Sequence, residues 1–133
     1  MSDKTMQVEL VAADRLVWSG EASRLIARTT EGDVGILPNH APMLSLMVDG
    51  IVDVTTAEGE TWIAAVDAGF LSVAANRISI LSEHAEMAHD IDLERARADL
   101  DRVRSAGELL NDAEEAAAKA WAEARIRAVE HSR

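Results

Sequence analysis

Short apolar runs separated by turn-forming residues fill most of the chain before residue 90. Their length and their content of Val, Ile and Thr are typical of β-strands. We expect seven strands, at residues 8–12, 16–20, 22–28, 51–56, 61–66, 69–73 and 77–81. Glu58-Gly59 and Ala74-Ala75-Asn76 lie between consecutive runs and are typical of hairpin turns. This spacing favours an antiparallel sandwich or barrel.

From residue 91 onward the apolar positions recur every three or four residues, which is the period of an amphipathic helix. The first helical stripe consists of Leu93, Ala96, Leu100 and Val103. The second consists of Leu110, Ala113, Ala117, Ala120 and Ala124. Asp92 is the predicted N-cap of the first helix and Gly107 its predicted stop. The short connection predicts an antiparallel two-helix hairpin, and its alanine seam buries too little apolar area to hold it tightly.

The change of period places a domain boundary near Asp90. Residues 1–90 carry five Lys/Arg against fourteen Asp/Glu, whereas residues 91–133 carry eight against ten. The sequence therefore predicts a β-domain at 1–90 and a helical hairpin at 91–133.

Composition excludes several classes of protein. A formal net charge of -11 argues against a nucleic acid or an anionic membrane surface as partner. The sequence has no apolar run long enough for a transmembrane helix, and its start lacks the form of a signal peptide. Cysteine is absent, which excludes disulfides and thiolate metal sites. We expect any membrane contact to run through another protein.

Candidate catalytic and metal sites are weak. His84, Glu86 and His89 do not have the spacing of a helical metal motif, and we interpret them as a solvated turn. No nucleophile elbow or phosphate loop occurs. Asp99 and Asp101 are interpreted as a solvated helix face. The sequence predicts a non-catalytic protein without a metal.

The segment Gly32–Leu44 stands out because two glycines and two prolines surround a short apolar run. Proline fixes φ and removes a backbone donor, so neither a helix nor a regular strand continues through Pro38 and Pro42. We expect a stiff, shaped loop. Taken alone, this pattern is equally compatible with a rigid connection that has no function.

This loop resembles the signature segment of the epsilon subunit of F-type ATP synthases. Two further segments are similar to that family: Val66–Val73 with the strand after it, and Ile91–Ala96 at the start of the helices. Ala68 stands where many members have glycine. The resemblance extends over nearly the whole chain.

The resemblance implies a ten-stranded antiparallel β-sandwich followed by an antiparallel two-helix hairpin. It implies a non-catalytic rotor subunit in the central stalk of a proton-translocating synthase, on the cytoplasmic face of the bacterial cell membrane. Its expected partners are the gamma subunit, the c-ring and, when the helices extend, the catalytic alpha/beta subunits. The extended helices are expected to block ATP hydrolysis. The residues expected near the c-ring or gamma are Glu31, Pro38, His40 and Pro42.

The resemblance also implies ATP as a regulatory ligand that holds the helices folded, with no cofactor required. The matching positions are Glu86, Ile91, Asp92, Arg95, Ala96, Arg102 and Arg125. Three converging guanidiniums are suited to a triphosphate. Val129 fills a position where a further basic residue is expected, which weakens this clamp. Alternatively, Asp92 only caps a helix and the arginines form exposed ion pairs of about 0–1 kcal/mol. A free-standing ligand- or protein-binding sandwich with a helical lid is the other functional interpretation.

Overall fold

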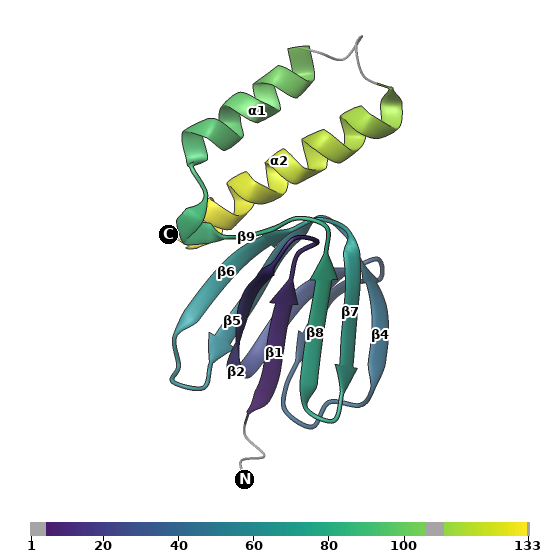
Figure 1. Cartoon of the computed structure of the whole chain (residues 1–133), viewed down its shortest axis with the longest axis vertical. Coiled ribbons are helices and arrows are strands. Elements are labelled where there is room, and N and C mark those ends of the chain that lie inside the picture. Colours follow the sequence, from purple (N-terminus) through teal and green to yellow (C-terminus); the bar gives the residue numbers. More distant parts are fainter. Residues whose placement is uncertain (1–4, 106–110, 133) are drawn as a thin grey trace.

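The computed structural model of the chain describes residues 5–105 and 111–132. Within them, nine strands precede a short 3-10 helix and two α-helices (Figure 1). The strands are β1 (Met6–Val11), β2 (Leu16–Thr29), β3 (Gly32–Ile36), β4 (Met43–Met47), β5 (Gly50–Thr56), β6 (Thr61–Val66), β7 (Gly69–Ala74), β8 (Arg77–Ser82) and β9 (Ala85–Met87). The helices are η1 (Ala88–Asp90), α1 (Leu93–Ser105) and α2 (Asp112–Ser132).

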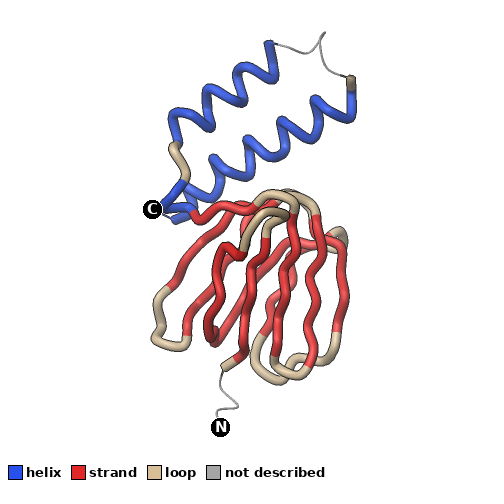
Figure 2. Tube along the Cα trace, viewed as in Figure 1, coloured by secondary structure: helices blue, strands red, loops and turns tan. Residues whose placement is uncertain are grey.

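The strands form two layers that share β2. One layer has the order β1-β8-β7-β4, and the other continues from β2 through β5 and β6 to β9, with β3 paired to β2. Figure 2 shows the strands gathered into one body, with both helices on one side of it. The predicted sandwich followed by two helices is therefore confirmed.

The structure corrects the number and direction of the strands. Nine strands are present in the described residues where the family resemblance implies ten. The sandwich is also not wholly antiparallel, because β1 pairs in parallel with β8. The predicted strands at 16–20 and 22–28 are one strand, β2, whose register shifts between Ala22 and Arg24. This irregularity lets β2 pair with β1 along one half and with β5 along the other.

Three strands were not predicted because their sequences lack clear alternation. The segment Gly32–Leu44 was expected to be a loop throughout, but it contains β3 and the first two residues of β4, and only residues 37–42 connect the two strands. β9 occupies the segment interpreted as a solvated turn, where Ala85, Glu86 and Met87 pair with β6. Pairing with neighbouring strands, rather than local sequence preference, makes these segments extended.

The sandwich has its own hydrophobic core. Its members come from the strands and from the turn after β1, and the largest fully buried side chains are Leu10, Leu25, Ile36, Leu71, Ile78 and Ile80. A second, smaller cluster joins the outer face of β5 and β6 to the helices. It contains Ile63, Ala65, Ala88, Ile91, Ala96 and Ala128, with Trp121 and Ile51 packed against it.

The helices are arranged as an antiparallel hairpin in which α2 lies on the sandwich and α1 lies on α2 (Figure 1). Asp92 caps α1, since its Oδ1 accepts a hydrogen bond from the Arg95 amide at 3.1 Å. Gly107, the predicted stop, lies outside the described residues. The predicted stripe of α2 is wrong in part: Ala113 and Ala117 are exposed.

The alanines that α2 buries are Ala122, Ala124 and Ala128. The reason is that α2 packs on two sides at once, against α1 and against β5 and β6. A single stripe at helical spacing describes only one contact face. No helix within residues 5–105 and 111–132 is both long and apolar enough to cross a membrane.

Candidate functional site

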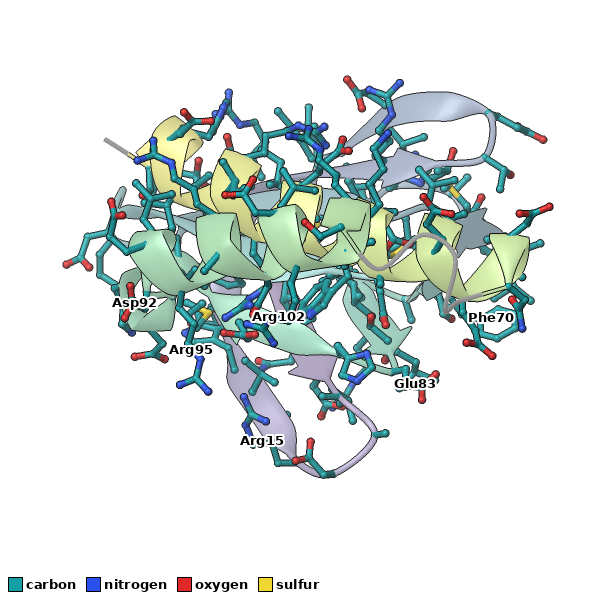
Figure 3. The ribbon with its side chains drawn as sticks, turned by 90° about the horizontal axis from the view of Figure 1, so that it is seen from above. Arg15, Phe70, Glu83, Asp92, Arg95 and Arg102 are labelled. Carbon is teal, nitrogen blue, oxygen red and sulfur yellow. The ribbon has the colours of Figure 1, made fainter. Side chains whose placement is uncertain are left out.

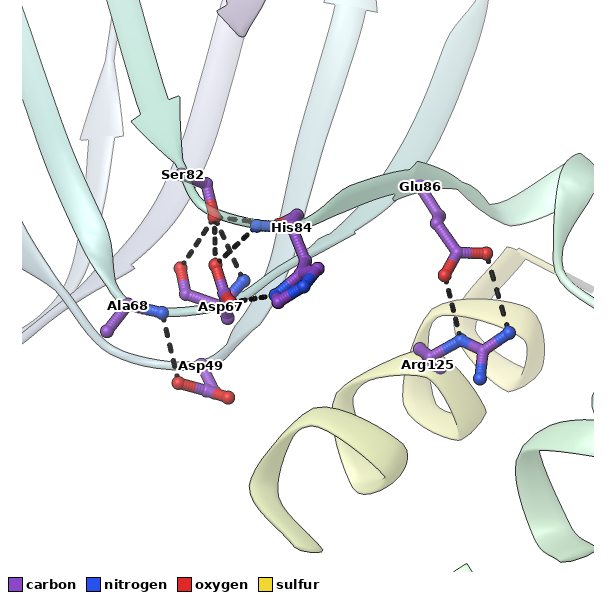
Figure 4. A network of polar contacts seen from close by, with 7 residues as sticks. All are labelled: Asp49, Asp67, Ala68, Ser82, His84, Glu86 and Arg125. Carbon is purple, nitrogen blue, oxygen red and sulfur yellow. Dashed lines mark hydrogen bonds and ion pairs between the residues drawn. The ribbon is translucent and has the colours of Figure 1, made fainter. Parts of the chain in front are cut away.

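A chain of ion pairs ties β9, α2 and α1 together. The side chain of Arg125 is 13% exposed, and its Nε lies 3.0 Å from Oε1 of Glu86 on β9 (Figure 4). Its Nη1 donates to Oδ2 of Asp99 on α1 at 3.1 Å. Oδ1 of the same Asp99 accepts from Nη2 of Arg102 at 2.6 Å. These four side chains join three elements through charge-assisted hydrogen bonds and ion pairs.

A pocket of about 450 Å³ opens between α1 and α2, beside these ion pairs. Its lining residues are Asp99, Arg102, Val103, Ala118, Trp121, Ala122 and Arg125. One side is charged, and the other is formed by an indole and small aliphatic side chains. This combination suits a ligand that carries both a flat apolar part and an anionic part.

The expected ATP-binding residues are divided among three places. Arg102 and Arg125 meet at Asp99, and Glu86 pairs with Arg125. Ile91 and Ala96, which are 8% and 0% exposed, belong to the apolar cluster between helices and sandwich. Asp92 and Arg95 lie at the start of α1, where Asp92 acts as the cap (Figure 3).

The charges of the ion-pair chain balance. Two carboxylates, Glu86 and Asp99, face two guanidiniums, Arg102 and Arg125. Part of the open alternative is therefore present: Asp92 does cap α1, and Arg102 does pair with Asp99. Asp99 itself was misjudged, because the sequence placed it on a solvated face. Its three-residue spacing from Arg102 signals a local pair, but no sequence signal indicates Arg125.

A second polar network lies next to the middle of α2 (Figure 4). Asp67 Oδ2 is 2.7 Å from Nδ1 of His84, and its Oδ1 accepts from the His84 amide at 2.9 Å and from the Ser82 hydroxyl. The His84 ring lies 5.6 Å from the ring of Trp121, centroid to centroid. His84 therefore connects the sandwich to α2 through an aromatic contact.

This geometry shifts both pKa values. The side-chain hydrogen bond to Asp67 raises the pKa of His84 above its ordinary 6.5, although partial burial opposes this. Partial burial by itself raises the pKa of Asp67, but the hydrogen bonds from His84 and Ser82 outweigh it and leave that pKa below 3.8. The pair thus favours an imidazolium beside a carboxylate.

The loop at residues 37–42 lies at the end of the sandwich away from the helices. Asn39 and Asn76 join it to the β7–β8 turn: the Asn39 amide donates to Oδ1 of Asn76, and Nδ2 of Asn76 donates to Oδ1 of Asn39 at 3.1 Å. Pro38, His40 and Pro42 are therefore carried on an anchored loop.

Glu31 is not close to these three residues. It lies in the turn between β2 and β3, whereas the loop follows the other end of β3. Five residues of extended chain separate the ends of β3 by roughly 15 Å. A partner that touches both Glu31 and His40 has to extend along this strand.

An exposed apolar row crosses the layer that the helices leave uncovered. Successive strand pairings align Leu46, Phe70 and Leu81 and continue the row through Val11 to Leu16. Leu46, Phe70, Leu81 and Leu16 are between 49% and 56% exposed, and Leu44, beside the row, is 73% exposed. A contiguous apolar surface of this kind marks a site of protein contact.

Comparisons with known proteins agree on one family. Residues 5–88 match the family described as "ATP synthase, Delta/Epsilon chain, beta-sandwich domain". The chain is 48% identical to an ATP synthase epsilon chain of Streptomyces avermitilis, covering 93% of this chain and 94% of that relative. It is 46% identical to that of Rhodococcus jostii, covering 96% and 98%.

Among solved structures, a chain of the Euglena gracilis mitochondrial ATP synthase has the same fold, with a TM-score of 0.71 at 20% identity. It is matched over 96% of this chain and 78% of that one. A chain of the Tetrahymena thermophila mitochondrial ATP synthase has a TM-score of 0.60 at 19% identity, over 96% and 95%. On the sequence matches, the chain belongs to the family of ATP synthase epsilon chains.

Proposed function

We propose that this chain is a rotor subunit of a proton-translocating F-type ATP synthase, non-catalytic itself, on the cytoplasmic face of the bacterial membrane. The sandwich attaches to the gamma subunit and rests on the c-ring. Membrane contact occurs only through the assembled complex.

The exposed apolar row from Leu46 to Leu16 is the observation that carries this proposal. The helices pack mainly on β5 and β6 of the other layer, so a partner reaches the row without displacing them. Four exposed large apolar side chains in one row are costly in water and gain about 25 cal/mol for each Å² that a partner covers. We assign this surface to gamma, and the anchored loop with Pro38, His40 and Pro42 to the c-ring.

Copurification tests the assignment. The tagged chain, expressed in its source cell, is expected to bring down gamma and c subunits. Leu46→Asp with Phe70→Ser places a charge and a hydroxyl in the row and is expected to abolish this. Ala57→Asp, an exposed site in the β5–β6 turn outside both the row and the loop, is the control. A parent chain that brings down neither subunit indicates a free-standing binding module.

We assign the restraint of ATP hydrolysis to the helices. In the folded arrangement α2 covers the outer face of β5 and β6, and the small cluster around Ile63 and Ala128 holds it there. Most of the buried helical side chains are alanines, which contribute little apolar area. This supports an exchange between the folded hairpin and an extended form that reaches the alpha/beta subunits.

We further propose that ATP binds between the helices as a regulatory ligand. The pocket beside Arg102 and Arg125 supports this, since it combines guanidiniums with the indole of Trp121. Arg95 is exposed at the start of α1 and is available to the phosphates.

Calorimetric titration of the isolated chain with ATP tests this site. Heat of binding is expected from the parent, and less from Arg95→Ala. Arg97→Ala, which removes another exposed arginine of α1, is the matched control. No heat from the parent, or equal heat from the parent and Arg95→Ala, contradicts the site.

A further inference from the structure

Asp99 holds both guanidiniums of the helical pocket at once. Its Oδ1 accepts from Arg102 Nη2 at 2.6 Å and its Oδ2 accepts from Arg125 Nη1 at 3.1 Å. The carboxylate is thus shared between the two helices, with 30% of the Asp99 side chain exposed.

The two oxygens of Asp99 accept hydrogen bonds from two separate guanidiniums, as the oxygens of one phosphate group would. Asp99 therefore occupies the N–H donors of Arg102 and Arg125 that an incoming anion needs. It is covalently part of α1, so its high effective concentration makes it a strong competitor of a ligand in solution.

We propose that Asp99 is an internal competitor that sets the anion affinity of this pocket, and that any phosphate-bearing ligand binds there by displacing its carboxylate. The proposal rests on the nucleotide site assigned above. It predicts that the parent chain binds phosphate groups weakly although Arg102 and Arg125 are in place.

The two arginines differ in how they respond to displacement. Arg125 is only 13% exposed and keeps its ion pair with Glu86 at 3.0 Å, so it stays in position when Asp99 leaves. Arg102 has a side chain 72% exposed and is free to turn toward a ligand. Only Asp99 has to rotate, and the pocket of about 450 Å³ at its side has room for the phosphates.

The test compares Asp99→Asn with Asp101→Asn. Both variants remove one negative charge from α1, and Asp101 is exposed two residues further along the helix. Calorimetry at fixed ionic strength uses inorganic tripolyphosphate and ATP as separate probes. Asp99→Asn is expected to bind tripolyphosphate about tenfold more tightly than the parent, the effect of removing one charge-assisted competitor. Asp101→Asn is expected to stay within about twofold of the parent.

Asp99→Ala is the second variant, because the asparagine amide oxygen still accepts one hydrogen bond. Equal tripolyphosphate affinity in the parent and both Asp99 variants, or an equal gain in Asp101→Asn, overturns the proposal. A gain for tripolyphosphate without binding of ATP supports the role of Asp99 and contradicts the nucleotide assignment. Equal ATP binding by the parent and the Asp99 variants supports the nucleotide assignment and contradicts the role of Asp99.

Discussion

Replacing Gly69 by alanine should destabilise the sandwich by closing a contact that only glycine permits. A Cβ on Gly69 would lie 2.0 Å from the carbonyl oxygen of Leu81 and 3.0 Å from Cα of Ser82 on the adjacent strand. Both are backbone atoms, so no side chain can rotate away. β7 and β8 would have to separate by about 1 Å at the Gly69–Ser82 pair.

The magnitude follows from this displacement. Hydrogen bonds between the strands near Gly69 would be lost, at about 0.5–1.5 kcal/mol each. Overpacking adds about 1–3 kcal/mol, and the lower entropy of the unfolded alanine chain offsets about 0.4–1 kcal/mol. We expect a net loss of about 2–4 kcal/mol, a large part of the 5–15 kcal/mol typical of a domain.

Urea denaturation measures this loss. The fluorescence of Trp18 and Trp62, whose rings lie 4.6 Å apart in the sandwich, reports its unfolding. With a slope of about 1–3 kcal/mol per M, the midpoint of Gly69→Ala should fall by roughly 1–3 M. Gly35→Ala is the control, because nothing lies within 4 Å of its added Cβ. A parent-like midpoint for Gly69→Ala, or an equal loss in Gly35→Ala, would show that the close approach of β8 to Gly69 does not limit stability.

The pH dependence of stability, the loop and the helices each give a further test. The lowered pKa of Asp67 adds stability above pH 3.8 that disappears as the pH falls through the folded-state value. The raised pKa of His84 adds stability below pH 6.5 that disappears as the pH rises through its folded-state value. The loss of unfolding free energy in Asp67→Asn should thus be greatest between pH 3.8 and 6.5, measured by urea titration; a pH-independent loss contradicts this. Pro38→Gly with Pro42→Gly should loosen the loop and lower the ratio of ATP made to protons transported in membrane vesicles, and an unchanged ratio counts against a torque-bearing loop. A chain ending at Asp90 keeps the strand core and should fold and assemble, and the synthase that contains it should hydrolyse ATP at least as fast as the synthase with the full chain; failure to assemble would place the domain boundary elsewhere.

Features that depend only on neighbours along the chain could be predicted from the sequence. The helical period after residue 91 and the cap at Asp92 are local, and both are present. The hairpins at Glu58-Gly59 and Ala75-Asn76 are equally local, since Gly59, Ala75 and Asn76 all have positive φ values that tight turns require. The overall order of sandwich and helices follows from these periods.

Which side chains meet depends on how the separate elements pack together. β9 becomes a strand because β6 supplies its hydrogen-bonding partner, and β2 becomes one strand because two layers share it. From the sequence, Asp99 was predicted to be a solvated acid on α1. In the structure, α2 brings Arg125, 26 positions away, to its carboxylate. Glu86 is 39 positions from the same arginine. Periodicity specifies the face of an element, whereas these contacts depend on how separate elements pack, and that depends on the whole buried surface.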